Sequence, residues 1–300
     1  MKKLNIILMF LFLSVLLPLT AQDHVTEIRN KLLNRDQNSV LVAAHRGDWR
    51  NAPENSLAAI DNAINMGVDI VEVDVQRTKD GHIILMHDKT LNRTTTGKGL
   101  ISEWTLDSIR TLKLKNGCNI KTKEVVPTLE EALIHAKGKI MLNLDKADRF
   151  FDEVYALMEK TGTTKQIIMK GSKSPQEVKD KFGEYLNDVI YMPVVDLDKK
   201  SAAEQIGFFV SDLNPVAFEL LYKEDSNTLP KEMAEFLDGK ALIWYNTLWD
   251  TLCGGHDDDM ALENRDNAYG YLIDNLGARI IQTDRPAYLI EYLKERKLHN

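Results

Sequence analysis

The feature that most constrains the fold is an alternation, repeated eight times, of short apolar runs with stretches of helical periodicity. Apolar runs rich in β-branched residues are typical of strands buried on both faces of a parallel sheet. The runs span residues 39–45, 69–75, 138–145, 166–170, 189–195, 216–222, 240–246 and 278–284. This alternation predicts one α/β domain, a (β/α)₈ TIM barrel.

Capping residues mark the predicted helices between these runs. Residues 55–67 carry apolar residues at helical spacing and end at Gly67, a C-terminal cap. Residues 128–138 begin at Thr128, and Glu131 completes a capping box there. Both segments have the length and the boundaries of barrel helices.

Two longer segments interrupt the alternation. Residues of about 88–127 are expected to form a small insertion after the second strand, and residues 247–263 form a polar loop. Long excursions in a barrel usually lie over the active face. The loop carries Asp257, Asp258 and Asp259 in succession. Such a run suggests either a second cation site or a solvated turn, and we expect the solvated turn.

The first 21 residues differ from the rest. Two lysines are followed by an apolar run that continues to Leu19, and small residues precede a predicted cleavage near Ala21. This pattern is typical of a secretory signal peptide, and the run is shorter than the roughly 20 residues of a membrane span. An uncleaved N-terminal anchor is the alternative. We expect residues 22–300 to be one secreted or periplasmic domain, without stable membrane insertion after removal of the signal.

Composition excludes some partners. A net charge of −7 without a concentrated basic face argues against nucleic-acid binding. Cys118 and Cys253 are the two cysteines of the chain. Export makes a disulfide between them possible, but they are too far apart in sequence to indicate a metal site. No residue pattern defines an oligomeric state.

Polar residues gather where the predicted strands end, which in a TIM barrel is the catalytic face. These residues are His45, Arg46, Glu72, Asp74, Asp145, Lys170, Glu219 and Asn246. Glu72 and Asp74 are two positions apart, so both point to one face of their strand. Paired carboxylates repel each other unless a cation neutralises them. A divalent ion with Asp145 as a third oxygen ligand would do so. Salt bridges to Arg46 or Arg77 are the alternative.

A second histidine is predicted to reach the same face. Asp80-Gly81 is a tight-turn signal, so residues 82–87 are expected to pair with the end of the second strand and deliver His87. A lone histidine is more often structural than catalytic. His45 and His87 together at one barrel mouth can divide the roles of general acid and general base.

These motifs, in this order, resemble the glycerophosphodiester phosphodiesterase family. The matching stretches are AHRG (44–47), PENS (53–56), EVD (72–74), DG (80–81), HD (87–88), LNRTTTGKG (91–99), PTLEEAL (127–133) and TDRP (283–286). Each stretch alone is a weak signal, whereas their order and spacing are specific. They cover nearly the whole chain after the predicted signal peptide.

The resemblance implies a barrel enzyme that cleaves a small-molecule glycerophosphodiester to glycerol phosphate and an alcohol. It implies that His45 and His87 are the acid–base pair and that Arg46 binds phosphate, for which its planar fork is suited. Glu72 and Asp74 match ligands of one divalent cation, Mg²⁺ or Ca²⁺, and Asp145 lies where many members have a third-ligand Glu.

One position departs from the family pattern. Many members have Glu-x-Lys at the end of the third strand, with the lysine facing phosphate, but this chain has Asp145-Lys146-Ala147. Strand alternation predicts that Lys146 points away from the site. Lys170 is the candidate replacement, although it could equally be a solvated lysine. Glu54 in the PENS motif is expected either to be a hydrogen-bond partner of a catalytic group or to be a charge at the helix N-terminus that the helix dipole stabilises.

The residues leave several alternatives open. A phospholipase-D-like lipid phosphodiesterase would need an apolar mouth, and the acidic loop 247–263 argues against one. A non-catalytic phosphodiester-binding protein could share the fold, although both histidines are present. The residues do not separate attack by a neighbouring glycerol hydroxyl from attack by water, or the acid histidine from the base. The alcohol could be choline, ethanolamine, glycerol or inositol.

Overall fold

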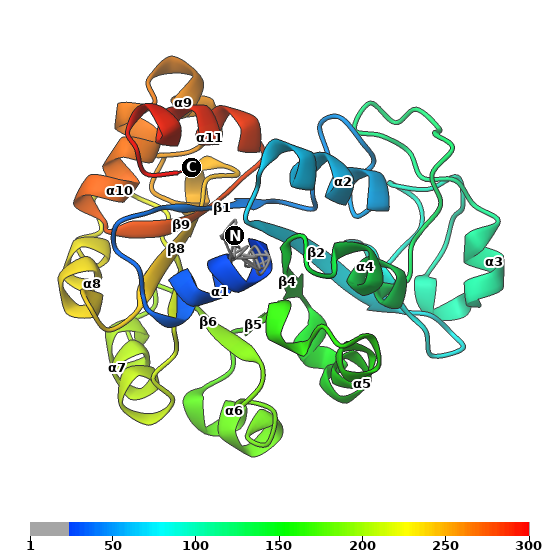
Figure 1. The fold of residues 1–300 in the computed structure, drawn as a ribbon, viewed down its shortest axis with the longest axis horizontal. Coiled ribbons are helices and arrows are strands. Elements are labelled where there is room, and N and C mark those ends of the chain that lie inside the picture. The colour runs from blue at the N-terminus through cyan, green and yellow to red at the C-terminus, as the bar shows by residue number, and fades with distance from the viewer. Residues whose placement is uncertain (1–23, 300) are drawn as a thin grey trace, which may run out of the picture.

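Eight parallel strands close into a barrel in the computed structural model, which describes residues 24–299 (Figure 1). The neighbour order is β1-β9-β8-β7-β6-β5-β4-β2, and pairing of β1 with β2 closes the ring. The strands are β1 (Leu41–Ala44), β2 (Ile70–Arg77), β4 (Met141–Asp145), β5 (Ile167–Gly171), β6 (Ile190–Asp196), β7 (Ala217–Leu221), β8 (Leu242–Asn246) and β9 (Ala278–Thr283). The predicted TIM barrel is confirmed, with every predicted strand present.

Helices surround the barrel in the order that the sequence predicts (Figure 1). They are α2 (Leu57–Met66), α4 (Leu129–Ala136), α5 (Phe151–Thr161), α6 (Pro175–Phe182), α7 (Ala202–Asp212), α8 (Leu229–Leu237), α9 (Asp258–Glu263), α10 (Tyr271–Asn275) and α11 (Pro286–Glu295). Gly67 ends α2 with a φ of 81°, and Thr128 and Glu131 form the capping box of α4. These predicted caps are confirmed.

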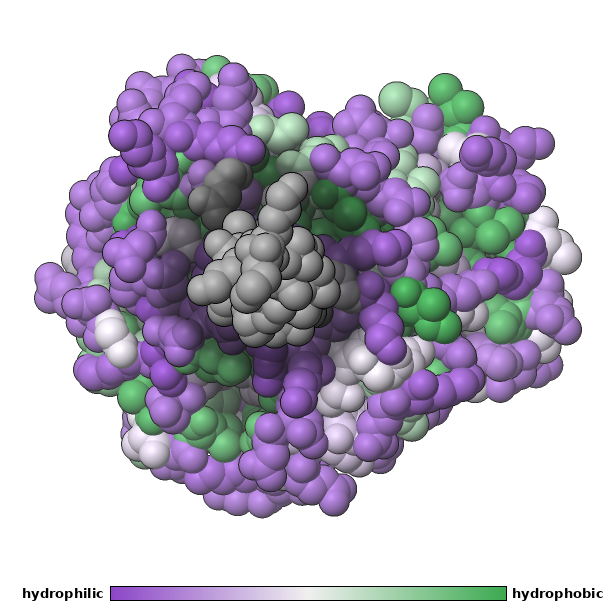
Figure 2. All heavy atoms as spheres, viewed as in Figure 1, coloured by the Kyte–Doolittle hydropathy of each residue, from purple (hydrophilic) through white to green (hydrophobic). Residues whose placement is uncertain are grey.

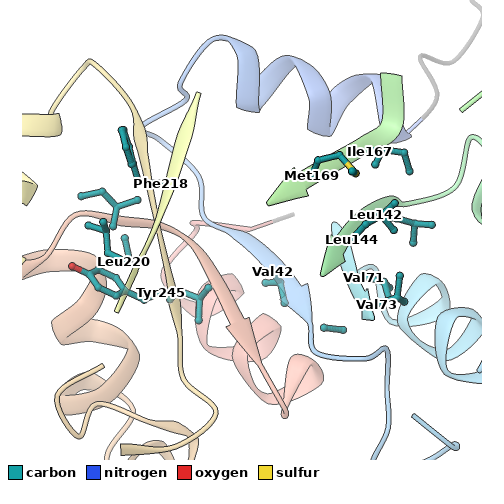
Figure 3. Close-up of a cluster of buried hydrophobic side chains, with 14 of the residues drawn as sticks. Val42, Val71, Val73, Leu142, Leu144, Ile167, Met169, Phe218, Leu220 and Tyr245 are labelled. Atoms are coloured by element: carbon teal, nitrogen blue, oxygen red, sulfur yellow. The ribbon is translucent and has the colours of Figure 1, made fainter. Parts of the chain in front are cut away.

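Alternation along each strand separates two apolar layers. Side chains that face outward pack under the helices, and Figure 3 shows Val71 and Val73 of β2 beside Leu142 and Leu144 of β4 in this layer. Side chains that face inward at the start of each strand form a second cluster, which includes Ile70. The barrel interior is therefore a packed core at its N-terminal end.

A helix that the sequence analysis did not predict covers this N-terminal end. Helix α1 (His24–Leu33) lies across the centre of the barrel in Figure 1. Its buried residues Val25, Ile28 and Leu32 belong to the same cluster as the inward-facing strand residues. The surface in this view is mostly hydrophilic, with hydrophobic side chains in separate patches (Figure 2).

The predicted insertion follows β2. Strand β3 (Ile83–Leu85) pairs antiparallel with β2, and the 3₁₀ turn at Ile101–Glu103 and helix α3 (Leu106–Arg110) come after it. This segment lies beside the barrel (Figure 1). It has its own small core of Ile84, Met86, Leu91, Ile101, Ile109, Leu114 and Val126. The short strand expected after the turn at Gly81 is confirmed.

The acidic run in the 247–263 loop is not the expected solvated turn. Asp257 caps α9, and Asp258 is only 3% exposed. Asp258 accepts hydrogen bonds from the hydroxyls of Thr247 and Thr283, and from the backbone N–H of Asp284. The expectation fails because these hydrogen bonds hold Asp258 in a buried position between the ends of β8 and β9. Of the three aspartates, only Asp259 is exposed.

The remaining sequence expectations concern export and redox state. The predicted signal peptide, residues 1–21, lies outside the described residues. Within residues 24–299, no helix combines the length and apolar character that a membrane span needs. Both Cys118 and Cys253 are free thiols, the first exposed and the second buried.

Candidate active site

Three carboxylates meet at the C-terminal end of the barrel. Parallel pairing of β2 with β4 sets Asp74 opposite Asp145, and alternation brings Glu72 to the same inner face. Oxygen atoms of the three lie within 4.8 Å of one another. They form the one such group of potential metal ligands within residues 24–299. The structure thus brings the predicted ligands together.

The electrostatics of this cluster indicate a place for positive charge. Burial, and then the neighbouring Asp74, raise the pKa of Glu72 to about 7. Burial also opposes ionisation of Asp145, but Lys170 and Lys146 outweigh it and lower the pKa of that carboxyl to about 2. Carboxylate oxygens are the ligands that Mg²⁺ and Ca²⁺ prefer, so the donor set fits either ion.

His45 is held in one orientation at the tip of β1. Its Nδ1 lies 2.8 Å from Oδ1 of Asp284, and its Nε2 lies 3.1 Å from Nε of Arg46. Because the guanidinium nitrogen can only donate, Nε2 accepts and Nδ1–H donates to Asp284. The accepting nitrogen of His45 is thus turned toward Arg46, the phosphate-binding arginine that the sequence predicts.

Arg46 adopts a left-handed backbone conformation with a φ of 52°, which is uncommon outside glycine. Its backbone N–H donates to Glu72 at 3.0 Å, and its Nη1 donates to Glu54 at 3.0 Å. Glu54 also accepts two bonds from Arg93 of the insertion, at 2.5 and 2.8 Å. Burial raises the pKa of Glu54, but Arg93 and Arg46 outweigh it and lower that pKa. Glu54 therefore holds the Arg46 guanidinium in place at the site.

His87 lines the same mouth as His45 and is more exposed, with 38% of its side chain accessible. Its Nδ1 is 2.8 Å from Asp88, and its Nε2 is 4.0 Å from Asp74. A doubly protonated His87 would have a carboxylate near each ring nitrogen. Hydrogen bonds from Arg93, together with the bond from His87, lower the pKa of Asp88 to about 2 against the effect of burial.

The prediction that Lys146 points away from the site is wrong. Its Nζ lies 2.5 Å from Oδ1 of Asp74, 3.2 Å from the carbonyl oxygen of His87 and 3.5 Å from Asp145. Strand alternation does not apply because β4 ends at Asp145 and Lys146 is left-handed, with a φ of 63°. The turn directs the side chain back into the mouth.

Lys170 is buried rather than solvated, at 7% exposure. Its Nζ lies 3.3 Å from Glu219 and 3.9 Å from Asp145. Burial disfavours its charge, but the carboxylates, led by Glu219, outweigh this and raise the pKa of Lys170. Asn246 donates to Glu219 at 2.8 Å. The predicted residues Lys170, Glu219 and Asn246 therefore form one hydrogen-bonded row across the barrel interior.

Two functional positions lay within the quoted motifs but were not recognised from them. Asn55 of PENS donates to Asp74 through Nδ2 at 3.0 Å and accepts from the Asp74 backbone at 2.9 Å. Asp284 of TDRP orients His45 and accepts from Nε1 of Trp49 at 2.6 Å. Asn55 has a φ of 57°, so only the following Ser56 caps α2. A buried amide or acid beside a catalytic motif is the signal that could have found them.

Two cavities open at this face and share the wall formed by His45, Arg46 and Trp249. The barrel mouth, about 380 Å³, contains the carboxylate cluster, His87 and both lysines. The second cavity, about 570 Å³, runs between the barrel and the insertion. Both volumes are in the range of small-molecule sites.

Comparison with known proteins agrees with this arrangement. Residues 45–175 match the model of the glycerophosphoryl diester phosphodiesterase family, and residues 191–293 match a domain of unknown function. A glycerophosphodiester phosphodiesterase of Caldanaerobacter subterraneus is 48% identical over 94 residues, which are 30% of this chain and 38% of that protein. The chain matches less than half the length of this protein and of other curated relatives.

Solved structures match over more of the chain. A glycerophosphoryl diester phosphodiesterase from Parabacteroides distasonis is 25% identical with a TM-score of 0.75, covering 91% of this chain and 92% of that one. An Oleispira antarctica phosphodiesterase in complex with the product sn-glycerol-3-phosphate shares the fold at 20% identity, with a TM-score of 0.61 and coverage of 86% and 97%. Residues 45–175 and the barrel as a whole are therefore similar to members of the glycerophosphoryl diester phosphodiesterase family.

Proposed function

We propose that this protein hydrolyses glycerophosphodiesters to a glycerol phosphate and an alcohol. The observation that carries the proposal is one barrel mouth that joins Arg46, two imidazoles and a cluster of three carboxylates. This combination offers groups for phosphate binding, proton transfer and charge neutralisation. The family match over residues 45–175 and the Parabacteroides distasonis structure support the same reaction.

Glu72, Asp74 and Asp145 would hold one divalent cation, Mg²⁺ or Ca²⁺. Such an ion, when bound, supplies positive charge beside the phosphodiester oxygens. The raised pKa of Glu72 supports this assignment, since a bound cation would offset both the burial and the repulsion from Asp74 that raise it. Asn55 holds Asp74 by two hydrogen bonds, which fixes the orientation of that ligand.

Arg46 and Lys146 would bind the phosphate. The Arg46 guanidinium lies against His45 and is held by Glu54, so its donors are already oriented at the junction of the two cavities. Lys146 reaches the mouth from a left-handed turn, and its Nζ lies near Asp74, Asp145 and the carbonyl oxygen of His87. Charge-assisted bonds from both residues would stabilise the developing negative charge on the non-bridging oxygens.

The two histidines differ in a way that supports separate roles. His45 has an accepting Nε2 because Arg46 donates to it, which suits a general base. His87 has carboxylates on both sides, which suits a proton donor to the leaving alcohol. We therefore propose that His45 removes the proton from the nucleophile and that His87 protonates the leaving oxygen.

Release of glycerol phosphate from a small glycerophosphodiester, with and without chelator, tests the proposal. We expect chelator to abolish turnover and Mg²⁺ or Ca²⁺ to restore it. Asp74→Asn should abolish turnover while the thermal unfolding curve stays cooperative. Asp148→Asn is the matched control, since Asp148 lines the same mouth but lies outside the carboxylate cluster. Full activity in exhaustive chelator would exclude the metal-dependent mechanism.

We also propose that the protein is exported. The lysine pair and the apolar run before Ala21 support this proposal. Mass spectrometry of the mature protein from expressing bacteria should find an N-terminus near residue 22 in the secreted or periplasmic fraction. Recovery of the intact N-terminus in the membrane fraction would favour an uncleaved anchor.

A further inference from the structure

The second cavity, which we call the groove, offers a place for one part of the substrate. It shares His45, Arg46 and Trp249 with the barrel mouth. A phosphodiester has two ester arms, so a phosphate bound at this shared wall would place one arm in each cavity. This inference rests on the proposed function, and it concerns the identity of the alcohol.

The two cavities differ in how their walls are built. In the mouth, Lys170, Glu219 and Asn246 are bonded to one another, which leaves a small space with fixed polar groups. The groove is larger and is walled by the insertion and by Trp249. Glycerol is the arm common to all glycerophosphodiesters and fits the smaller, fixed space. The groove is then the site of the variable alcohol.

The charges in the groove disfavour a cationic alcohol. Its two carboxylates are already engaged: Glu54 pairs with Arg46 and Arg93, and Asp284 accepts hydrogen bonds from His45 and Trp49. Lys115 of the insertion has no carboxylate within ion-pair distance among residues 24–299, and its Nζ contacts only a backbone carbonyl, at 3.4 Å. A choline or ethanolamine group would therefore meet an uncompensated positive charge.

Trp49, an aromatic residue of the groove, does not offset this repulsion by binding the cation on its ring. The Arg50 guanidinium lies over the Trp49 ring, 4.7 Å from its centroid, and Gly117 packs against that ring. The ring is therefore covered by a cation and a backbone segment. Trp249, in contrast, is 48% exposed and gives the groove an apolar surface.

Hydrogen-bonding groups line the rest of the groove. Asn92 and Asn116 use their side-chain oxygens to accept backbone N–H groups, of Gly99 in one case and of Cys118 in the other. Their amide nitrogens donate to no other residue within 24–299, and Asn119 stands beside them. Amide and ammonium donors around an exposed aromatic ring suit hydroxyl oxygens.

We propose that the groove binds an uncharged polyhydroxylated alcohol, a cyclitol or a sugar, as the leaving group of the substrate. The donors come from Lys115, Asn92 and Asn116, and Trp249 supplies the apolar face. The insertion after β2 thus determines substrate specificity, while the barrel mouth carries the chemistry.

Competition among defined substrates tests this assignment. We would measure kcat/KM for glycerophosphoinositol, glycerophosphoglycerol, glycerophosphocholine and glycerophosphoethanolamine. We expect the inositol diester to exceed the choline diester by at least about tenfold, which corresponds to ~1.4 kcal/mol. Equal rates, or a preference for choline or ethanolamine, would overturn the inference while leaving the proposed function intact.

A pair of charge reversals locates the effect. Lys115→Glu should reduce the preference for inositol over choline by about tenfold, mainly through KM. Lys121→Glu is the matched control. Lys121 forms an antiparallel backbone bridge with Lys115 in the insertion but does not line the groove. If both variants change the preference equally, the general field of the protein sets it and the groove assignment is wrong.

Binding separates failure of this inference from failure of the proposed function. Calorimetry with His87→Ala, which lies outside the groove, would give dissociation constants for the four intact diesters. Tighter binding of the inositol diester supports the groove assignment even if the wild-type protein cleaves none of them. Indistinguishable or weaker binding of the inositol diester rejects it, whatever the turnover assays show.

Discussion

The two ends of the barrel use the same strands for opposite purposes. On β2, the inward-facing residues are Ile70 near the start, then Glu72 and Asp74. At the N-terminal end, such residues form an apolar cluster that α1 covers with Ile28 and Leu32. At the C-terminal end, the same rows become carboxylates, lysines and amides around an open mouth. Two residues along a strand, about 6.6 Å, separate packing from chemistry.

The polar end is where this fold accepts unfavourable burial. The apolar end contains side chains that need no partners. At the boundary above it, Asn143 is fully buried, and its amide makes no hydrogen bond with any residue between 24 and 299. Gln282 likewise has a buried side-chain oxygen without a partner in that range. Unsatisfied polar groups and repelling carboxylates destabilise the folded state, so the active end depends on the apolar end for its stability.

The largest expected effect is on catalysis at the polar end. His45→Ala should reduce kcat by roughly 10²–10⁴-fold, because it removes a proton-transfer group. His135→Ala is the control, since that histidine pairs with Asp61 away from the mouth. Adding His87→Ala to His45→Ala should cost much less than the product of the single effects. Multiplicative effects would contradict a shared acid–base cycle.

The next effect is on stability at the apolar end. Ile28→Ala in α1 should lower the free energy of unfolding by about 2–5 kcal/mol, because it leaves a cavity under the barrel. Leu33→Ala in the same helix is the control and should change little, since Leu33 is 40% exposed. Chemical denaturation measures both. A loss of kcat in Ile28→Ala at a temperature where it is fully folded would show that the two ends are coupled.

The lysines test how far the polar end is divided into roles. Lys146→Met should raise KM by roughly tenfold or more, through loss of a charge-assisted bond to phosphate. Lys170→Met should mainly lower stability, because it leaves Glu219 buried without its cation. Kinetics and denaturation of both variants separate the roles. If Lys170→Met raises KM more than Lys146→Met does, Lys170 binds the phosphate, as the sequence suggested.

The strand rows were predictable because they depend on period-two alternation, which is local. Glu72 and Asp74 pointed inward as expected, and Asp145 joined them through strand pairing. Lys146 could not be placed in this way, since a left-handed residue after the strand reverses the direction of its side chain. Period-two alternation is uninformative there.

Contacts between distant segments were also beyond local patterns. Asn55 meets Asp74 across 19 positions, and Asp284 meets His45 across 239. Asp258 appeared solvated because its neighbours are acidic, yet hydrogen bonds from two strand ends bury it. Helix α1 packs only because the finished barrel presents an apolar end. Each of these features follows from barrel closure rather than from sequence spacing.

The smallest expected effect is a difference in acid sensitivity between the wild-type protein and Asp284→Asn. Burial opposes ionisation of Asp284, but the hydrogen bonds from His45 and from the Trp49 N–H outweigh it and lower the pKa of this carboxyl. A lowered pKa in the folded state contributes stability above the ordinary value of about 3.9. That stability disappears as the pH falls through the folded-state pKa. In chelator, wild-type protein should therefore lose stability more steeply than Asp284→Asn as the pH falls below about 4. Asp212→Asn, which removes an exposed carboxylate paired with Lys179, should change the slope less. Parallel pH profiles for wild-type and Asp284→Asn would mean that the bond to His45 orients the imidazole without stabilising the fold, and the acid sensitivity of the polar end would then arise from its other carboxylates.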